Sequence, residues 1–125
     1  YRIYFISKSK NEKGENMARV FVVQENPNVN ILAAGHYGEL IPLLKPGKQI
    51  TLSSAPVVRL LKSKLKDYSD KDFILAMGDP VAIGIAAIAA SDNNNGKVNI
   101  LKWDRENKAY YNVFIDYYQK GENDV

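Results

Sequence analysis

Residues 81–90 are all apolar or glycine, and this run limits the possible folds more than any other part of the chain. Gly78, Asp79 and Pro80 precede it in a pattern that predicts a helix start, with Asp79 as the N-cap and Pro80 at the first helical position. A helix without a polar face must be covered on most sides. Ten residues are too few to cross a bilayer, so we expect protein to cover this helix, either this chain or a second subunit.

Apolar runs before and after this helix predict the strands of one sheet. The runs are short and bounded by turn residues, and they span residues 20–24, 29–34, 40–44, 73–77, 97–103 and 110–117. Residues 35–38 predict a tight connection between two strands, and residues 104–108 predict a hairpin turn. A second helix is predicted over residues 56–68, where apolar and basic side chains recur with a helical period after the capping residues Ser53 and Ser54.

The order of these elements predicts the fold class. Strands and helices alternate between residues 40 and 103, which is typical of a mostly parallel sheet, and the last two strands predict an antiparallel hairpin. The 125 residues fit one domain. We therefore expect a single small α/β domain with a central, mostly parallel sheet, two helices and a C-terminal antiparallel hairpin.

Residues 1–16 differ from the rest of the chain. They combine a strand-like segment, YRIYFIS, with a polar connector, and the strongly patterned sequence begins only after Met17. We expect the α/β domain to comprise residues 17–125 and Met17 to be the natural start. Residues 1–16 would then be an added edge strand or upstream sequence.

Composition excludes several classes of function. With 46% hydrophobic and 25% charged residues, the chain is typical of globular proteins. The absence of cysteine excludes disulfide scaffolds, thiolate zinc sites and cysteine nucleophiles. The net charge of +3 is too small to imply nucleic acid binding without a local cluster. No apolar run approaches the roughly 18 residues of a membrane span, so we expect no membrane partner.

The turn at Gly78 and Asp79 is the first candidate ligand site. It leads from a predicted strand into a predicted helix, and parallel sheets bind ligands at the carboxyl ends of their strands, where a helix N-terminus favours an anion. Ser53, Ser54 and His36 are further candidate ligand-binding residues. The single Gly78 matches neither of the glycine-rich phosphate-binding motifs. Simple capping by Asp79 is the alternative interpretation, and the sequence leaves both open.

No catalytic residue, metal site or cofactor is predicted. His36 is the only imidazole in the chain, and no nucleophile stands at a recognisable spacing from it. A metal site would need the fold to gather His36 with Asp70, Asp72 or Asp79, and such scattered residues are weak evidence. His36 is better explained as a turn residue.

A basic stripe and a group of aromatic residues are candidate binding surfaces. Arg59, Lys62 and Lys66 share one face of the helix predicted over residues 56–68 and could contact nucleic-acid phosphates, although solvated helix faces have the same pattern. In the terminal hairpin, Trp103, Tyr110 and Tyr111 lie among cationic residues, as in base-stacking platforms and protein-binding hot spots. Strand aromatics are commonly buried, so we expect core or subunit-interface positions for them.

Four segments of the chain resemble a group of small uncharacterised proteins encoded by tailed bacteriophages. The segments are RVFVVQE, HYGELIPLL, DFILAMGDPVAIGIAA and LKWDRENKAYY, and the likeness covers roughly residues 17–115. The resemblance implies a phage gene product that acts in the cytoplasm of a bacterial host. It implies no catalytic or binding residue.

Three hypotheses about function follow. The first is a non-catalytic accessory protein of a phage type that binds another protein, from host or phage, or assembles with itself. The second is a small-ligand or nucleotide-binding domain that uses Gly78 and Asp79. The third is a nucleic-acid-binding protein that uses the basic helix.

Overall fold

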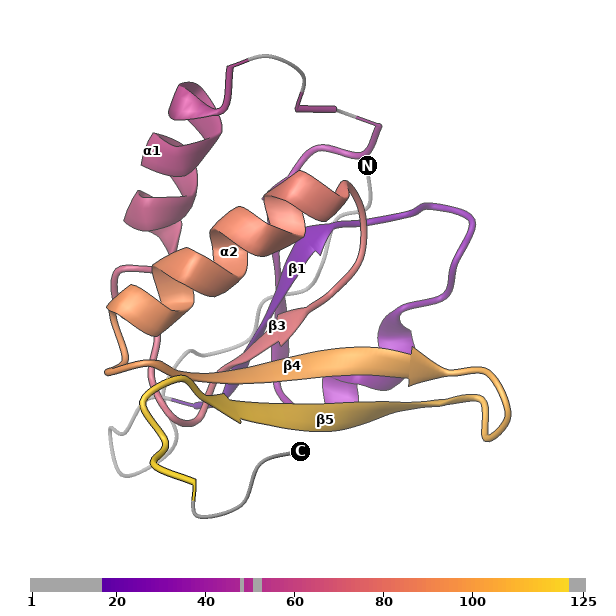
Figure 1. Ribbon diagram of the computed structural model, residues 1–125. Helices are drawn as coiled ribbons and strands as arrows, with labels where there is room; N and C mark the ends of the chain where they lie inside the picture. The colour runs from indigo at the N-terminus through magenta and orange to yellow at the C-terminus, as the bar shows by residue number, and fades with distance from the viewer. Residues whose placement is uncertain (1–16, 48, 51–52, 122–125) are drawn as a thin grey trace.

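A computed structural model describes residues 17–47, 49–50 and 53–121 of the chain. Their strands form one five-stranded sheet in the order β2-β1-β3-β4-β5. The strands are β1 (Arg19–Gln24), β2 (Glu39–Leu44), β3 (Phe73–Leu75), β4 (Lys97–Asp104) and β5 (Ala109–Asp116). The helices are the 3-10 helix η1 (Leu32–His36) and the α-helices α1 (Ala55–Lys64) and α2 (Pro80–Asp92). Figure 1 shows both α-helices on one face of the sheet.

The sheet is parallel except at one edge. β2, β1, β3 and β4 pair in parallel, and β5 pairs with β4 as an antiparallel hairpin. The connection from β2 through α1 to β3 passes over β1, which lies between them in the sheet. The predicted single α/β domain, with its mostly parallel sheet, two helices and terminal hairpin, is confirmed.

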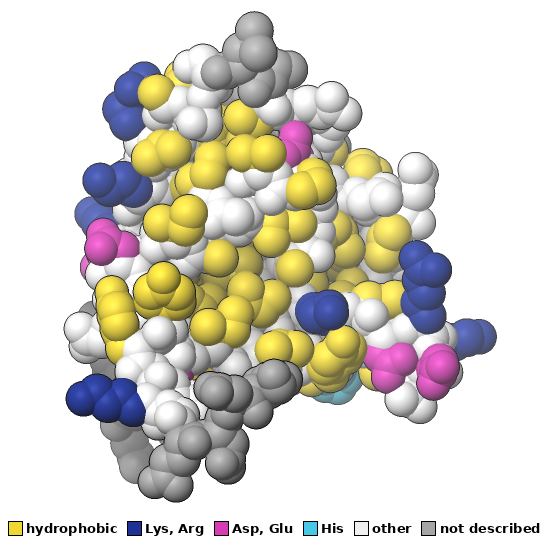
Figure 2. Space-filling view, in the orientation of Figure 1, with side chains coloured by type: hydrophobic (Ala, Val, Ile, Leu, Met, Phe, Trp, Pro, Cys, Tyr) yellow, Lys and Arg dark blue, Asp and Glu magenta, His cyan; other side chains and the backbone are white. Residues whose placement is uncertain are grey.

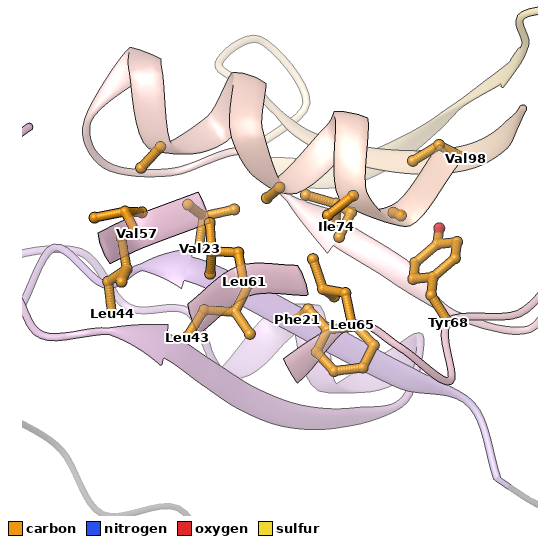
Figure 3. Close-up of a cluster of buried hydrophobic side chains, with 14 residues drawn as sticks. Phe21, Val23, Leu43, Leu44, Val57, Leu61, Leu65, Tyr68, Ile74 and Val98 are labelled. Atoms are coloured by element: carbon orange, nitrogen blue, oxygen red, sulfur yellow. The ribbon is translucent and has the colours of Figure 1, made fainter. Parts of the chain in front are cut away.

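The core lies on both faces of the sheet. On the helix side, alternate residues of the strands meet the inner faces of α1 and α2 (Figure 3); this cluster includes Phe21, Val23, Ile74, Val98, Val57, Leu61, Leu65, Ala82 and Ala86. On the other side, the intervening strand residues meet η1; this cluster includes Val20, Val22, Leu75, Leu101, Ile31 and Ala34. Because both faces of β1 and β3 are buried, these strands are continuous apolar runs in the sequence.

The strand predicted over residues 29–34 is wrong, because this segment contains a turn and the 3-10 helix η1. The Asn30 side chain accepts a hydrogen bond from Leu32 N–H, and Ala34 N–H donates to the carbonyl of Ile31. Only Ile31 and Ala34 of this run are buried. A spacing of three residues between buried positions fits a 3-10 turn and not the period of two of a strand.

The predicted helix over residues 56–68 is observed in a shorter form. α1 ends at Lys64, and Leu65 and Tyr68 continue its buried side through a turn. Leu60 is exposed although it is one of the apolar residues of this helix. Ser54 occupies the N-cap position, but its side chain makes no capping hydrogen bond. The strand predicted within residues 1–16 lies outside the described residues.

Asp72 joins the amino end of β1 to the turn before β3. Its carboxylate accepts hydrogen bonds from the backbone N–H of Arg19 and of Ser69, and it forms an ion pair of 2.8 Å with the Arg19 guanidinium. The Asp72 carbonyl accepts a hydrogen bond from the Tyr68 hydroxyl, which in turn accepts one from Asn99 N–H. These contacts hold β1, β3 and β4 together at one end of the sheet.

Candidate functional site

Gly78 and Asp79 lie at the carboxyl ends of the strands, as predicted. In the sheet, β2 lies on one side of β1 and β3 lies on the other, so the strand order changes direction at β1. Ligands of open α/β sheets bind at the carboxyl ends of the strands where the order changes direction in this way. A pocket of about 430 Å³ is present there. It is lined by Gln24, Glu25, Asn26, Pro27, Gly47, Gln49, Gly78, Asp79 and Pro80.

The backbone N–H groups at the start of α2, beside this pocket, already donate hydrogen bonds within the chain. Asp79 Oδ1 accepts from the N–H groups of Val81 and Ala82, at 2.8 and 3.3 Å, and Asp79 Oδ2 accepts from Ile50 N–H at 3.1 Å. The hydrogen bond from Ile50, with those from Val81 and Ala82, lowers the pKa of Asp79. Asp79 N–H itself donates to Gln24 Oε1. An anion at the start of α2 would have to displace these bonds, and Asp79 would repel it.

Gly78 is required by the geometry of this turn. Its φ is +107°, and a Cβ at this position would lie 2.4 Å from Cβ of Gln24. The glycine therefore lets β1 and the turn before α2 approach closely. This contact explains the conformation without a ligand, and ligand binding at Gly78 and Asp79 stays a prediction.

The other predicted ligand residues are not gathered around the pocket. Ser53 and Ser54 precede α1 and are exposed, and neither lines the pocket. His36 ends η1, close to Gly38, whose backbone packs against Ala18 at the amino end of β1. Gly78 packs against Gln24 at the carboxyl end of the same strand. The rise per strand residue separates these two ends by roughly 20 Å, so His36 and Gly78 belong to opposite ends of the sheet.

The basic residues Arg59, Lys62 and Lys66 are exposed, as a nucleic-acid interface requires. Lys66 lies beyond the end of α1, and Lys62 borders a shallow apolar pocket with Ile85 and Ile88 of α2. A role for this stripe in binding nucleic acid stays a prediction. Within the described residues, no three His, Asp or Glu side chains are close enough to hold a metal ion, and no helix is long and apolar enough to span a membrane.

Among the described residues, the sheet and α1 cover part of the apolar helix α2 and leave one side of it exposed. Its alanines face the sheet, and Ala82, Ala86, Ala89 and Ala90 are buried. The larger side chains on the opposite side are in solvent, since Val81 is 49% and Ile88 is 71% exposed. Small residues against the sheet bring α2 close to β1 and β4, so the helix does not extend over the edge strand β5.

β5 is exposed on both faces through its centre, from Tyr111 to Ile115. Its register with β4 pairs Ile115 with Val98 and Val113 with Ile100, which places Tyr111, Val113 and Ile115 on the helix side of the sheet. Phe114, paired with Asn99, lies on the other side and is also exposed. No α-helix among the described residues covers this end of the sheet.

A groove of about 410 Å³ separates α2 from the end of β5. Its lining is mostly apolar and comes from three segments: Ala87, Ile88, Ser91 and Asp92 of α2, Gly96 and Val98, and Ile115, Tyr117 and Tyr118. Figure 2 shows hydrophobic side chains gathered in one area over α2 and toward the hairpin, with charged side chains mainly at its margin. We call the exposed flank of α2, this groove and the helix-side face of β5 the apolar face.

The three aromatic residues predicted from the sequence have different surroundings. Tyr110 is in the core, and its ring packs edge-on against Trp103 with 4.9 Å between the ring centroids. Trp103 and Tyr111 are exposed, and Tyr111 lies on the apolar face. Burial raises the pKa of Tyr110, whose hydroxyl has no hydrogen-bond partner in the described structure.

Sequence reasoning missed most residues of the apolar face, which are Val81, Ile88, Val113, Ile115, Tyr117 and Tyr118. One signal was available, because residues 81–90 are all apolar or glycine and a helix without a polar face needs cover on most sides. The pattern could not identify which side of the helix remains exposed, since no polar residue marks it.

Comparison with known proteins places the chain in a family. No curated protein and no solved structure matches it significantly. A family model described as "Phage Pam3 gp32-like protein" matches residues 18–117. This match confirms the resemblance to small phage proteins and covers the whole five-stranded sheet, both α-helices and the apolar face except Tyr118. The chain therefore belongs to the phage Pam3 gp32-like protein family.

Proposed function

We propose that this protein is a non-catalytic phage accessory protein that works inside the host cell and assembles with itself through the apolar face. The observation that carries the proposal is the exposed flank of α2, which includes Val81 and Ile88 and continues across the groove to Ile115. Monomeric proteins rarely expose contiguous apolar patches beyond a few hundred Å², and larger ones mark interaction surfaces.

The composition of the apolar face fits a permanent protein interface. Aliphatic and tyrosine side chains dominate it, and Asp92 is the one charged residue that lines the groove. Interface centres are depleted of charge and enriched in aromatic residues, whereas nucleic-acid interfaces are strongly basic. Fully burying one exposed isoleucine or valine contributes roughly 1.5–3 kcal/mol, so several such residues from two copies can offset the cost of association.

Light scattering coupled to gel filtration tests this proposal over a range of protein concentrations. We expect the wild-type chain to form a dimer or a higher oligomer, and the Ile88→Glu variant to be monomeric, because the substitution places a charge in the centre of the apolar face. Leu32→Glu is the matched control, since Leu32 is 64% exposed on η1, across the sheet from the α-helices. The control should retain the wild-type mass.

Two results would contradict the proposal. A wild-type chain that remains monomeric at the highest concentrations has no self-association to explain. An oligomer that Leu32→Glu dissociates and Ile88→Glu does not would assign the contact to the opposite face. A monomer that binds a host or phage protein only while Ile88 is intact would instead identify the apolar face as a site for a different partner.

A further inference from the structure

We infer that two copies of the chain join through β5, antiparallel about a twofold axis, with Asn112 of one copy opposite Asn112 of the other. This inference rests on the proposed self-association and specifies its geometry. The pairing would extend the five-stranded sheet into one continuous sheet of ten strands.

β5 has an outer edge with backbone groups available for pairing. It is the last strand in the sheet order, and no described strand lies beyond it. Tyr117 N–H donates to the carbonyl of Gly96, which shows that odd-numbered residues of β5 direct their backbone groups toward β4. The Tyr110 carbonyl accepts a hydrogen bond from the Tyr37 hydroxyl, so even-numbered residues point outward. Asn112 and Phe114 therefore present N–H and C=O groups at the edge.

Within the described residues, the edge lacks most of the features that prevent strand addition; the Tyr110 carbonyl already accepts a hydrogen bond from the Tyr37 hydroxyl, but a carbonyl oxygen has a second lone pair for the partner strand. Natural edge strands are protected by lysine, proline, bulges or short length. β5 has eight residues, AYYNVFID, without proline, glycine or lysine, and its pairing with β4 continues without a bulge from Ala109 to Asp116. Its one charged residue, Asp116, stands at the end.

Charge selects the register. Lys108, the turn residue just before β5, and Asp116, the last residue of β5, lie four positions before and after Asn112, so a twofold axis at Asn112 brings Lys108 of each copy near Asp116 of the other. An axis at Tyr111 would instead place Asp116 opposite Glu106, which is a repulsive pair. An axis at Val113 would leave both charges opposite tyrosines.

The same register gives favourable side-chain pairs on both faces of the joined sheet. Tyr111 lies opposite Val113 on the helix side, and Tyr110 lies opposite Phe114 on the other side. Pairs of aromatic residues and pairs of an aromatic with a β-branched residue stabilise antiparallel strands. The pairing also sets the helix-side faces of the two β5 strands side by side, with α2 of each copy on the same side of the joined sheet, so that the exposed flanks of the two α2 helices face each other across the joined strands.

A disulfide tests the register directly. The chain has no cysteine, so Asn112→Cys introduces a single thiol. Hydrogen-bonded antiparallel residues have Cα atoms about 5.5 Å apart, within the range of a disulfide. We expect mild oxidation to convert this variant into a covalent dimer on a non-reducing gel. Asn107→Cys, at the exposed hairpin turn, is the matched control and should remain largely uncrosslinked.

Charge exchange provides a second, independent measurement. Asp116→Lys and Lys108→Asp should each weaken the dimer by about tenfold, since each creates two like-charge contacts in the symmetric pair. The double variant should recover wild-type affinity in sedimentation velocity. Asp116 also accepts a hydrogen bond from Tyr118 N–H, and recovery in the double variant separates the charge contact from the loss of that bond.

The outcomes distinguish this inference from the proposed function. If wild-type protein dimerises and Ile88→Glu dissociates it, while Asn112→Cys does not crosslink and the charge variants have no effect, the β5 pairing is wrong and self-association stands. If the wild-type chain is monomeric, both proposals are wrong. Crosslinking at Asn112 together with recovery in the double charge variant would establish the pairing.

Discussion

Replacing Asp72 with asparagine should destabilise the fold by about 3 kcal/mol. Asp72 is 1% exposed, and its carboxylate accepts hydrogen bonds from Arg19 N, Nε and Nη2 at 3.1, 3.2 and 2.8 Å and from Ser69 N at 2.9 Å. An asparagine can keep one oxygen acceptor, but its amide group would face N–H donors. Removing one partner of a buried ion pair costs roughly 3–5 kcal/mol. The Arg19 side chain retains 19% exposure, so water compensates part of the loss and the lower end applies.

Urea unfolding measures this effect, and two features of the design keep it interpretable. Both proteins should carry Ile88→Glu, because dissociation of an oligomer would otherwise add to the free energy of unfolding. Asp70→Asn is the matched control: Asp70 is exposed two residues away, and its Oδ1 accepts a hydrogen bond from Asn94 that an asparagine oxygen can also accept. The control should change stability by less than about 0.5 kcal/mol.

A clear result would refute the reasoning about Asp72. If Asp72→Asn unfolds within about 0.5 kcal/mol of its parent, with an unchanged dependence on urea concentration, the contacts with Arg19 and Ser69 do not hold the sheet together at this end. A loss in the control as large as that in Asp72→Asn would instead assign the effect to the turn as a whole.

Three further predictions concern tyrosines and glycines, and urea unfolding checks each of them. Tyr68→Phe should cost about 1–3 kcal/mol because the hydroxyl makes two buried hydrogen bonds, whereas Tyr110→Phe should be neutral or slightly stabilising because its hydroxyl makes none within the described structure. Burial raises the pKa of Tyr68 to about 12, above the ordinary value of 10.0, so its contribution is complete below pH 10 and is lost as the pH rises toward 12. The stability difference between wild type and Tyr68→Phe should therefore narrow over that interval. Gly78→Ala should destabilise by about 1–3 kcal/mol because its φ is positive and Gln24 fills the space, whereas Gly84→Ala, with no atom within 4 Å of the added Cβ, should stabilise α2 by up to about 1 kcal/mol. Equal losses of stability in Tyr68→Phe and Tyr110→Phe would contradict the role of the Tyr68 hydrogen bonds. A stability difference between wild type and Tyr68→Phe that does not change with pH would contradict the raised pKa. A Gly78→Ala variant as stable as wild type would contradict the close approach of Gln24.

The sequence was sufficient for the fold class because its strongest patterns are local. The Asp79-Pro80 helix start and the hairpin between β4 and β5 were both predicted and are both observed. Residues 29–34 were predicted wrongly because a short, mostly apolar run is compatible with a strand or a turn. The hydrogen bonds that the Asn30 side chain and the Ile31 carbonyl accept favour the turn, and the hydrophobic pattern does not predict those bonds.

The candidate site was less predictable, since it depends on contacts distant in sequence. Gly78 and Asp79 were expected at the carboxyl edge of the sheet and are there. However, the backbone N–H of Asp79, which a ligand would use, already donates to the side chain of Gln24, 55 positions earlier in the chain. His36 was grouped with Gly78 and Asp79 as a candidate ligand residue because the sequence alone does not show at which end of β1 the turn of His36 packs. The register of β1 with β2 decides that question.

The arrangement of side chains on α2 argues that its outer flank has a role beyond folding of the single chain. A helix that only covers its own sheet gains most by placing large apolar residues inward and polar residues outward. In α2 the fully buried residues are alanines and Ile83 and Ile85 pack partly against the core, but Val81 and Ile88 lie in solvent. Polar substitutions at these exposed positions would be expected to cost the monomer little stability. The isoleucine at residue 88, beside a groove that ends at the edge strand β5, is therefore the position at which the proposed self-association would account for an apolar residue that folding of the single chain does not require.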